Sequence, residues 1–149
     1  MRIAIGADHA GFELKEELTG RLAAAGHAVI DLGTSSTDPV DYPDYAAAVG
    51  RAVVSGRAER GILVCGSGAG AAIAANKLDG IRCAQANETY TAHQSVEHDD
   101  ANVIALASRV VGSEVAWEVA EAFVGAEFIG AGRYQRRLDK VLELERNRV

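Results

Sequence analysis

The sequence predicts a single-domain, doubly wound α/β sandwich, in which helices cover both faces of a mainly parallel five-stranded sheet. Five short apolar runs alternate along the chain with segments of helical periodicity. No linker, repeat or low-complexity stretch divides residues 1–149. The chain has 149 residues, 48% of them hydrophobic, which is enough to bury one continuous core without disulfides.

The five predicted strands are almost entirely apolar. They are "RIAIGA" (2–7), "AVIDLG" (28–33), "GILVCG" (61–66), "RCAQAN" (82–87) and "NVIALA" (102–107). Because such strands are buried on both faces and are joined by helical crossovers, we expect neighbouring strands to run parallel. Ligands of these sheets bind beyond the carboxyl ends of the strands. This rule points to "GADHAG" (6–11), "VCGSGAG" (64–70) and the residues near "EHDDAN" (97–102).

Amphipathic helices are predicted between the strands. Leu14, Leu18 and Leu22 recur every four residues among charged side chains, which is typical of a helix lying on a sheet. The same spacing returns in the segment 113–124, where Val115, Val119 and Phe123 are the apolar positions.

A charged helix is predicted from about residue 133 to the end of the chain. Its apolar residues are Leu138, Val141, Leu142 and Leu144. We expect these apolar residues to pack on the body of the domain or on a neighbouring subunit, and we favour the subunit interface.

Composition excludes several classes of protein. The formal charge of −6 argues against nucleic-acid binding, because phosphate backbones are held by excess Lys and Arg. No apolar run approaches the roughly 20 residues that span a bilayer, so no membrane partner is expected. Cys65 and Cys83 make no disulfide framework and are expected to be reduced thiols of a cytoplasmic protein.

A glycine-rich turn follows the third predicted strand. The backbone N–H groups of Gly66, Gly68 and Gly70 would point outward at the start of a helix, where they can bind an anion or a developing oxyanion. A tight turn that only permits close packing is the first alternative. The second is dinucleotide binding by G-x-G-x-x-G/A with Ala71 in the last position and Glu88 on the ribose, although the motif does not follow the first strand.

Cys65 makes this turn a candidate for catalysis. A thiol at the end of a strand and facing a helix N-terminus should have a stabilised thiolate, which makes Cys65 a candidate base or nucleophile. The alternative is a small buried hydrophobic residue that ends a strand, which is the interpretation we favour for Cys83. Ser67 could donate a hydrogen bond to the thiolate or to substrate, or only cap the helix.

Cationic and acidic side chains supply further candidates. Arg133, Arg136 and Arg137 cluster at the last helix, and Arg109 follows a strand; their guanidinium groups suit a phosphate monoester, although a solvated helix face is the usual meaning of such a run.

Two histidines have acidic neighbours in the sequence. His9 follows Asp8, and His98 precedes Asp99 and Asp100, carboxylates that would favour its imidazolium form and a role as acid or base. These groups could instead bind a metal, but their spacing matches no ligand pattern, so no metal is expected.

Seven segments together resemble one known family. They are "GADHAGFELK" (6–15), "DYPDYA" (41–46), "CGSGAGAAIAANK" (65–77), "GIRCA" (80–84), "EHDDANV" (97–103), "SRVVG" (108–112) and "GRYQRRLDKV" (132–141). In this order and at these positions, the chain resembles the ribose-5-phosphate isomerase type B family over essentially its whole length. The wider group also includes galactose-6-phosphate isomerase subunits.

The resemblance implies a cofactor-free aldose-ketose isomerase with a Rossmann-like fold. It implies a homodimer or a dimer of dimers, with each site between two subunits. Cys65 would be the base that moves a proton between C2 and C1, and Ser67 would assist it. The backbone of Gly66, Gly68, Ala69 and Gly70 would hold the enediolate oxygen.

The remaining roles are also implied by the resemblance. His98 would open the furanose ring, Asp8 and His9 would contact the sugar and its phosphate end, and Tyr42 would line the site. The phosphate arginines would be Arg109, Arg133 and Arg137, whereas Arg136 falls outside the pattern.

Three positions depart from, or vary within, the family. Some members carry a glutamate base after the glycines, but this chain has Ala71 there, which leaves Cys65 as the candidate base. Asp99 stands beside His98 at a substrate-binding position where an asparagine is usual, and a carboxylate accepts hydrogen bonds but does not donate them. The substrate could therefore be another sugar phosphate, of a tetrose, allose or galactose. Tyr134 replaces a common histidine.

Overall fold

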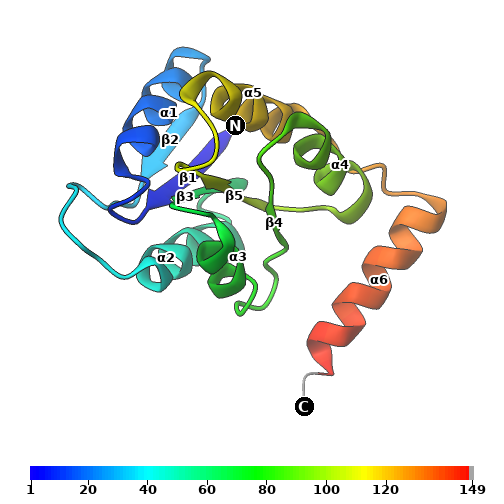
Figure 1. Cartoon of the computed structure of the whole chain (residues 1–149). Helices are drawn as coiled ribbons and strands as arrows, with labels where there is room; N and C mark the ends of the chain where they lie inside the picture. Colours follow the sequence, from blue (N-terminus) through cyan, green and yellow to red (C-terminus); the bar gives the residue numbers. More distant parts are fainter. Residues whose placement is uncertain (148–149) are drawn as a thin grey trace.

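A computed structural model describes residues 1–147 and contains the predicted five-stranded sheet. The strands are β1 (Arg2–Ala7), β2 (Ala28–Asp31), β3 (Arg60–Cys65), β4 (Cys83–Gln85) and β5 (Val103–Ala107). They lie in the order β2-β1-β3-β5-β4, and every pairing is parallel (Figure 1). The edge strands β2 and β4 are shorter than the predicted runs 28–33 and 82–87, whereas the three central strands match their runs to within one residue.

Helices cover both faces of the sheet, as predicted (Figure 1). They are α1 (Phe12–Ala24), α2 (Tyr42–Val54), α3 (Ala69–Ala75), α4 (Thr89–Asp99), α5 (Ser113–Gly125) and α6 (Gly132–Arg146). One apolar core joins the sheet to α1, α4 and α5, and a second joins it to α2 and α3. Leu18, Leu22, Val119 and Phe123 are fully buried, but Val115, in the first turn of α5, is exposed.

The direction of the elements decides which predicted segments share an edge. All carboxyl ends of the strands lie on one edge, because the strands are parallel. Residues 6–11 and 64–70 lie there, as predicted. Residues 97–102, however, end α4 and lead into the start of β5, so they lie at the amino edge. The prediction for this segment is wrong because it precedes a strand instead of following one.

The C-terminal helix α6 begins at Gly132, one residue before the expected start, and stands away from the body (Figure 1). Within α6 the buried side chain is Leu138, whereas Val141 and Leu144 are exposed. Near its end, Glu145 Oε1 accepts a hydrogen bond from the Gly80 N–H at 2.9 Å. A groove of about 490 Å³ lies between α6, β4 and the end of α4.

None of the helices in residues 1–147 combines the length and the apolar character needed to cross a membrane.

Candidate active site

A thiol and a carboxylate meet at the carboxyl edge of the sheet. Cys65 is the last residue of β3, and Asp8 directly follows β1, which pairs with β3. The Cys65 Sγ donates a hydrogen bond to Asp8 Oδ2 over 3.1 Å, and both side chains are more than 90% buried. Asp8 Oδ1 accepts a hydrogen bond from the Gly11 N–H at 3.1 Å. Both carboxylate oxygens of Asp8 are thus engaged, which fixes its orientation toward the thiol.

The surroundings of Cys65 favour its protonated form. Burial raises the pKa of the Cys65 thiol, and the hydrogen bond and negative charge of Asp8 raise it further. The backbone N–H groups of Gly66 and Gly68 act in the opposite direction but do not overcome these effects. The expected stabilised thiolate is therefore wrong for this chain on its own. Burial and a neighbouring carboxylate outweigh the start of α3, a helix of only seven residues.

The glycine-rich turn, residues 66–70, needs glycine at two positions for different reasons. Gly68 has a φ of +79°, and a Cβ there would lie 3.2 Å from the carbonyl oxygen of Leu106. Gly70 lies under the ring of Tyr42, where a Cβ would come within 2.8 Å of the Tyr42 Cζ. Backbone N–H groups are consequently not shielded by side chains of the turn, and Tyr42 at the start of α2 forms a wall beside them.

Ser67 lies exposed at the rim of this turn. Its Oγ accepts a hydrogen bond from the Ala69 N–H at 3.3 Å, and its carbonyl oxygen accepts one from Gln85 Nε2 at 2.6 Å. Gln85 at the end of β4 supports the turn through this hydrogen bond. The sequence did not indicate this role, because a local pattern does not show the order of the strands in the sheet.

Arg109 and His9 complete this edge. The Arg109 N–H donates to the carbonyl oxygen of Gly66 at 3.1 Å, so the chain after β5 runs beside the turn. A Cβ on Gly66 would lie 3.5 Å from the Arg109 Cδ, which places that side chain along the turn. His9 Nδ1 accepts a hydrogen bond from the Val40 N–H at 3.1 Å. We call these residues the carboxyl-edge cluster: Asp8, His9, Tyr42, Cys65, Gly66, Ser67, Gly68, Ala69, Gly70 and Arg109.

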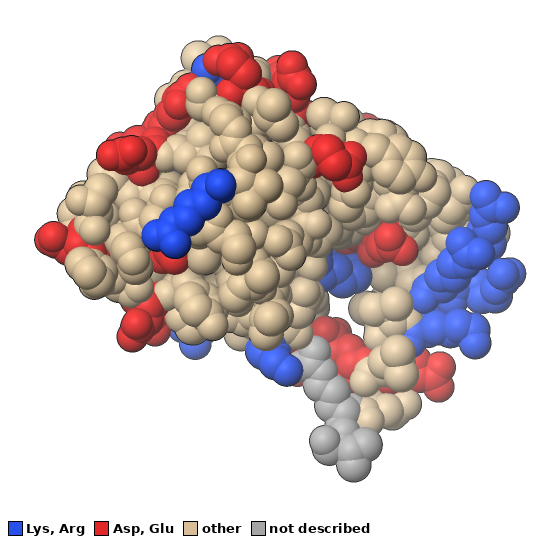
Figure 2. Space-filling view, in the orientation of Figure 1, with Lys and Arg blue, Asp and Glu red and all other residues tan. Residues whose placement is uncertain are grey.

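The other predicted site residues lie elsewhere, at the end of α4 and the start of α6. We call His98, Asp99, Arg133 and Arg137 the α4–α6 cluster. The His98 ring lies 4.6 Å from the Tyr134 ring, centroid to centroid, and its Nδ1 pairs with Gln94 Nε2 at 2.8 Å. Figure 2 shows basic side chains gathered along the outer side of α6.

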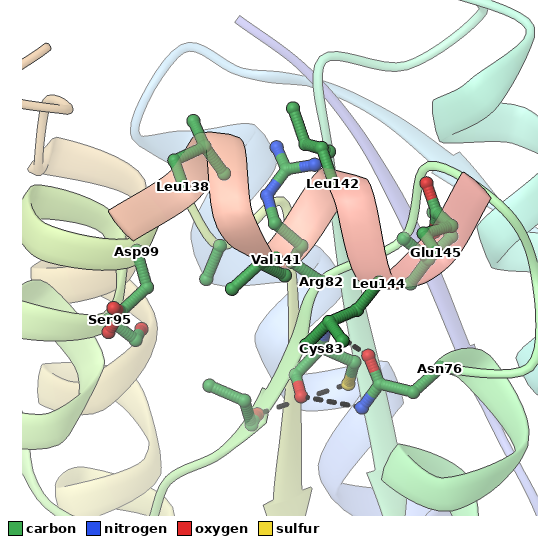
Figure 3. Close-up of a pocket in the computed structure, with 13 residues that line it drawn as sticks. Asn76, Arg82, Cys83, Ser95, Asp99, Leu138, Val141, Leu142, Leu144 and Glu145 are labelled. Atoms are coloured by element: carbon green, nitrogen blue, oxygen red, sulfur yellow. Dashed lines mark hydrogen bonds between the residues drawn. The ribbon is translucent and has the colours of Figure 1, made fainter. Parts of the chain in front are cut away.

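The acidic neighbours of His98 face other groups. Asp100, whose φ of +52° ends α4, pairs with the Arg82 guanidinium at 2.7 Å. Asp99 lines the groove beneath α6, near Ser95 and Leu138 (Figure 3). The contacts of the described chain thus give His98 an amide and an aromatic ring as partners, and not the carboxylates that adjacency in the sequence suggested.

Within a single chain, the carboxyl-edge cluster and the α4–α6 cluster lie far apart. Cys65 is level with Ala107 at the carboxyl edge, whereas His98 and Asp99 end α4, a few residues before β5 begins at Val103. Four residue steps along a strand cover about 13 Å. Hydrogen-bonding contact between the two clusters within one chain is excluded at this separation.

The structure also bears on the alternatives for the glycine turn and for Cys83. Glu88 accepts hydrogen bonds from the Thr91 N–H at 2.9 and 3.1 Å and caps α4. This capping role argues against the contact to a ribose that dinucleotide binding would require of Glu88. Cys83 starts β4 instead of ending a strand, and burial raises the pKa of its thiol to about 12. Across residues 1–147, no three His, Cys, Asp or Glu side chains gather to hold a metal ion.

Comparison with known proteins places this arrangement in a family. The model of the family described as Ribose/Galactose Isomerase matches residues 3–141. The chain belongs to this family. It is 46% identical over 147 residues to ribose-5-phosphate isomerase B of Escherichia coli, covering 99% of this chain and 98% of the relative.

Two further relatives bear on substrate and fold. A D-erythrulose-4-phosphate isomerase of Pectobacterium atrosepticum is 44% identical over 134 residues, covering 89% of this chain and 88% of the relative. The structure of ribose-5-phosphate isomerase B from Clostridium thermocellum is 45% identical and superposes with a TM-score of 0.97 over 100% of both chains. The resemblance seen in seven sequence segments is therefore confirmed over the whole fold.

Proposed function

We propose that this protein is a cofactor-free aldose-ketose isomerase that interconverts ribose 5-phosphate and ribulose 5-phosphate. Moving a hydrogen between adjacent carbons requires a base at the carbon and hydrogen-bond donors where negative charge develops. The observation that carries the proposal is the buried Cys65–Asp8 pair beside the open backbone of residues 66–70. The name of the Escherichia coli relative supports the choice of ribose 5-phosphate.

Cys65 must lose its proton before it can act as the base. Asp8 Oδ2 is the acceptor in direct contact with the thiol, so the S–H proton passes to that oxygen. The thiolate then takes the proton from C2, which forms an enediolate, and returns this proton to C1 while the hydroxyl proton on O2 passes to O1. Ser67 assists from the rim of the turn. At the end of the cycle the thiol recovers its proton from Asp8.

The glycine turn stabilises the charge that forms on substrate. The backbone N–H groups of Gly66 and Gly68 already face the sulfur closely enough to lower its pKa, so they are aimed at the reacting region. The backbone around Ala69 and Gly70 extends the same surface toward Tyr42. Each such donor contributes about 2.7 to 4 kcal/mol to lowering the activation free energy in comparable oxyanion sites.

Phosphate binding and ring opening fall to the remaining residues. Arg109 stands beside the turn, whereas Arg133 and Arg137 stand on α6 with exposed guanidinium groups suited to a phosphate monoester. His98 opens the ring, and Asp8 and His9 contact the sugar and its phosphate end.

We propose in addition that the enzyme works as a homodimer, or as a dimer of dimers, with His98, Arg133 and Arg137 of one copy serving Cys65 of the other. The two clusters lie at opposite edges of the sheet in one chain, which supports this arrangement. The groove under α6 also supports a dimer. Its apolar lining includes Val141, Leu142 and Leu144 of α6, with Ile81 and Cys83 opposite (Figure 3). A second copy could cover these apolar side chains.

Co-expression of two impaired variants tests the shared site, with activity measured at ribose 5-phosphate concentrations well below the wild-type KM. A Cys65→Ala chain and an Arg137→Ala chain each lack one half of every site in their own homodimers. Half of randomly assembled dimers are mixed, and one of the two sites in a mixed dimer is intact, so about a quarter of wild-type activity should return. If activity stays at the level of the separate variants, the site is not shared.

A tetrose phosphate is the second candidate substrate. The Pectobacterium relative favours it, and so does Asp99, whose carboxylate stands where a hydrogen-bond donor is usual in the family. The deciding measurement is kcat/KM for ribose 5-phosphate beside erythrose 4-phosphate, allose 6-phosphate and galactose 6-phosphate, without added metal or cofactor. Preference for the pentose supports the first proposal, and preference for another sugar moves the substrate to it. A cytoplasmic location fits these substrates and the free thiols of Cys65 and Cys83.

A further inference from the structure

Lys15 is a buried charge that the proposed mechanism does not use. It lies in the first turns of α1, and its side chain is only 1% exposed. Its Nζ is 2.6 Å from Asp31 Oδ2 and 2.6 Å from Glu16 Oε1, and it lies 5.5 Å from the centre of the Phe12 ring. Burial disfavours the ammonium, but the two carboxylates more than offset this and raise the pKa of Lys15. Only the lysine of these ion pairs is buried, because Glu16 and Asp31 are partly exposed. Since a cation is costly to bury, Lys15 calls for an explanation beyond stability.

Asp31 connects Lys15 to the segment that follows β2 through its two carboxylate oxygens. While Oδ2 binds Lys15, Oδ1 accepts a hydrogen bond from the Gly33 N–H at 2.9 Å. The Gly33 carbonyl oxygen then accepts from the Ala7 N–H at 2.7 Å, and the buried Thr34 donates its N–H to the Ala7 carbonyl at 2.9 Å. The chain therefore leaves the sheet bonded to Ala7, the residue directly before Asp8.

The loop that follows, residues 34–41, reaches the carboxyl-edge cluster at two places. Val40 donates its N–H to His9 Nδ1 at 3.1 Å, and the loop ends at Tyr42, whose ring covers Gly70. A backbone N–H can only donate, so Nδ1 must be the acceptor and a neutral His9 ring carries its proton on Nε2. The loop thus fixes His9 as an Nε2–H donor, the form that suits a phosphate or hydroxyl oxygen.

We infer that Lys15 and Asp31 are positioning residues, which hold the 34–41 loop so that Val40 fixes the tautomer of His9 for substrate binding. This inference rests on the proposed function for the role of His9, but not for the contacts that lead to it. Neither Lys15 nor Asp31 touches the substrate region directly, so their effect on the reaction passes through the loop and His9.

The test compares Lys15→Met, Lys15→Arg and a matched control, Arg60→Met. Arg60 is also a partly buried cation that joins two elements, because its guanidinium donates to the carbonyl oxygens of Phe123, near the end of α5, and Ala126, just after it. It lies at the start of β3, away from the 34–41 loop. The readouts are the melting temperature, the ¹⁵N chemical shifts of the His9 ring in the free protein, and KM and kcat for ribose 5-phosphate.

We expect Lys15→Met and Arg60→Met both to lower the melting temperature, but only Lys15→Met to change the His9 shifts from those of the Nε2–H form. We also expect Lys15→Met to raise KM about tenfold, the value of one hydrogen bond to a charged group, with a smaller change in kcat. Lys15→Arg should restore both. If Lys15→Met does not fold, Asp31→Asn should give the same changes, because Asp31 is on the surface side of the pair and is 37% exposed.

Loss of stability with unchanged His9 shifts and unchanged KM would overturn the inference, since Lys15 would then be only structural. The ring shifts are measured without substrate, so they stand even if ribose 5-phosphate is the wrong sugar. Conversely, a change in His9 shifts in a protein that isomerises a different sugar phosphate would support the positioning role and correct only the substrate.

Discussion

The carboxyl-edge cluster and the α4–α6 cluster differ in how the fold holds them. Cys65 ends β3, Asp8 directly follows the adjacent strand β1, and both residues are more than 90% buried. Arg133 and Arg137 stand on α6, an outer helix of which Leu138 is the buried side chain, and both arginines are exposed. The base must meet one carbon atom with little error, whereas a guanidinium on a long side chain can find a phosphate over a wider range.

The same difference suggests how two copies can share a site. A rigid half that carries the base needs no adjustment when a second subunit arrives. A cationic half on an outer helix can reach a phosphate in the other copy from outside. Losses in the rigid half should therefore appear in kcat, and losses in the outer half should appear in KM.

The largest expected effect follows from removing the base. Cys65→Ala should lower kcat by roughly 10²- to 10⁴-fold, the usual contribution of a positioned base, while ribose 5-phosphate still binds. Steady-state kinetics and calorimetric binding measure the two parts separately. Cys83→Ala is the matched control, because its thiol has a pKa of about 12 and takes no part in the reaction. Near-normal turnover by Cys65→Ala would show that another group is the base.

Removing a phosphate-binding arginine should act mainly on KM. Arg137→Ala should raise KM by roughly 10- to 100-fold, since a hydrogen bond to a charged group contributes about 1.5 to 3 kcal/mol, and should change kcat less. Arg136→Ala removes a neighbouring guanidinium that is also exposed and should leave both parameters near their wild-type values. Equal losses in the two variants would mean that α6 attracts phosphate by general charge, without a dedicated arginine.

Within the rigid half, Asp8 should control the protonation of Cys65. Asp8→Asn removes a negative charge and a hydrogen-bond acceptor that raise the pKa of the thiol, so the pKa should fall. It should not fall below the ordinary value, because burial is the larger cause and remains. Alkylation by iodoacetamide, followed against pH by mass spectrometry, should therefore reach half its maximal rate at a lower pH in the variant. A midpoint that stays in place or rises would show that the Cys65–Asp8 hydrogen bond does not form.

Much of the fold was predictable because the periodicity of single segments determines it. The central strands β1, β3 and β5 match their apolar runs to within one residue, and α6 begins one residue from its expected start. The carboxyl-edge position of Cys65 and the glycine turn followed from the rule for parallel sheets.

The remaining features depend on pairings that local patterns do not contain. The Cys65–Asp8 contact requires β1 and β3 to be neighbours, which nothing within either segment specifies. Lys15 occupies a position among charged residues of an amphipathic helix, yet it is buried because Asp31 lies beside it. The sequence placed His98 with Asp100 because they are two residues apart, but the left-handed turn at Asp100 directs that carboxylate to Arg82.

The smallest expected effect concerns Ser67, which belongs to the rigid half by sequence but is exposed at its rim. Its Oγ accepts from the Ala69 N–H, so Ser67→Ala should cost about 1 kcal/mol as one lost hydrogen bond, or roughly 2 to 4 °C in melting temperature. Because the hydroxyl only assists the base, kcat should fall less than about tenfold. Ser108→Ala is the control, since that hydroxyl bonds the carbonyl oxygens of Ala10 and Cys65 and should affect stability without changing kcat. A loss above a hundredfold in Ser67→Ala would place its hydroxyl on the reacting atoms and would mean that the rim closes inward when substrate binds.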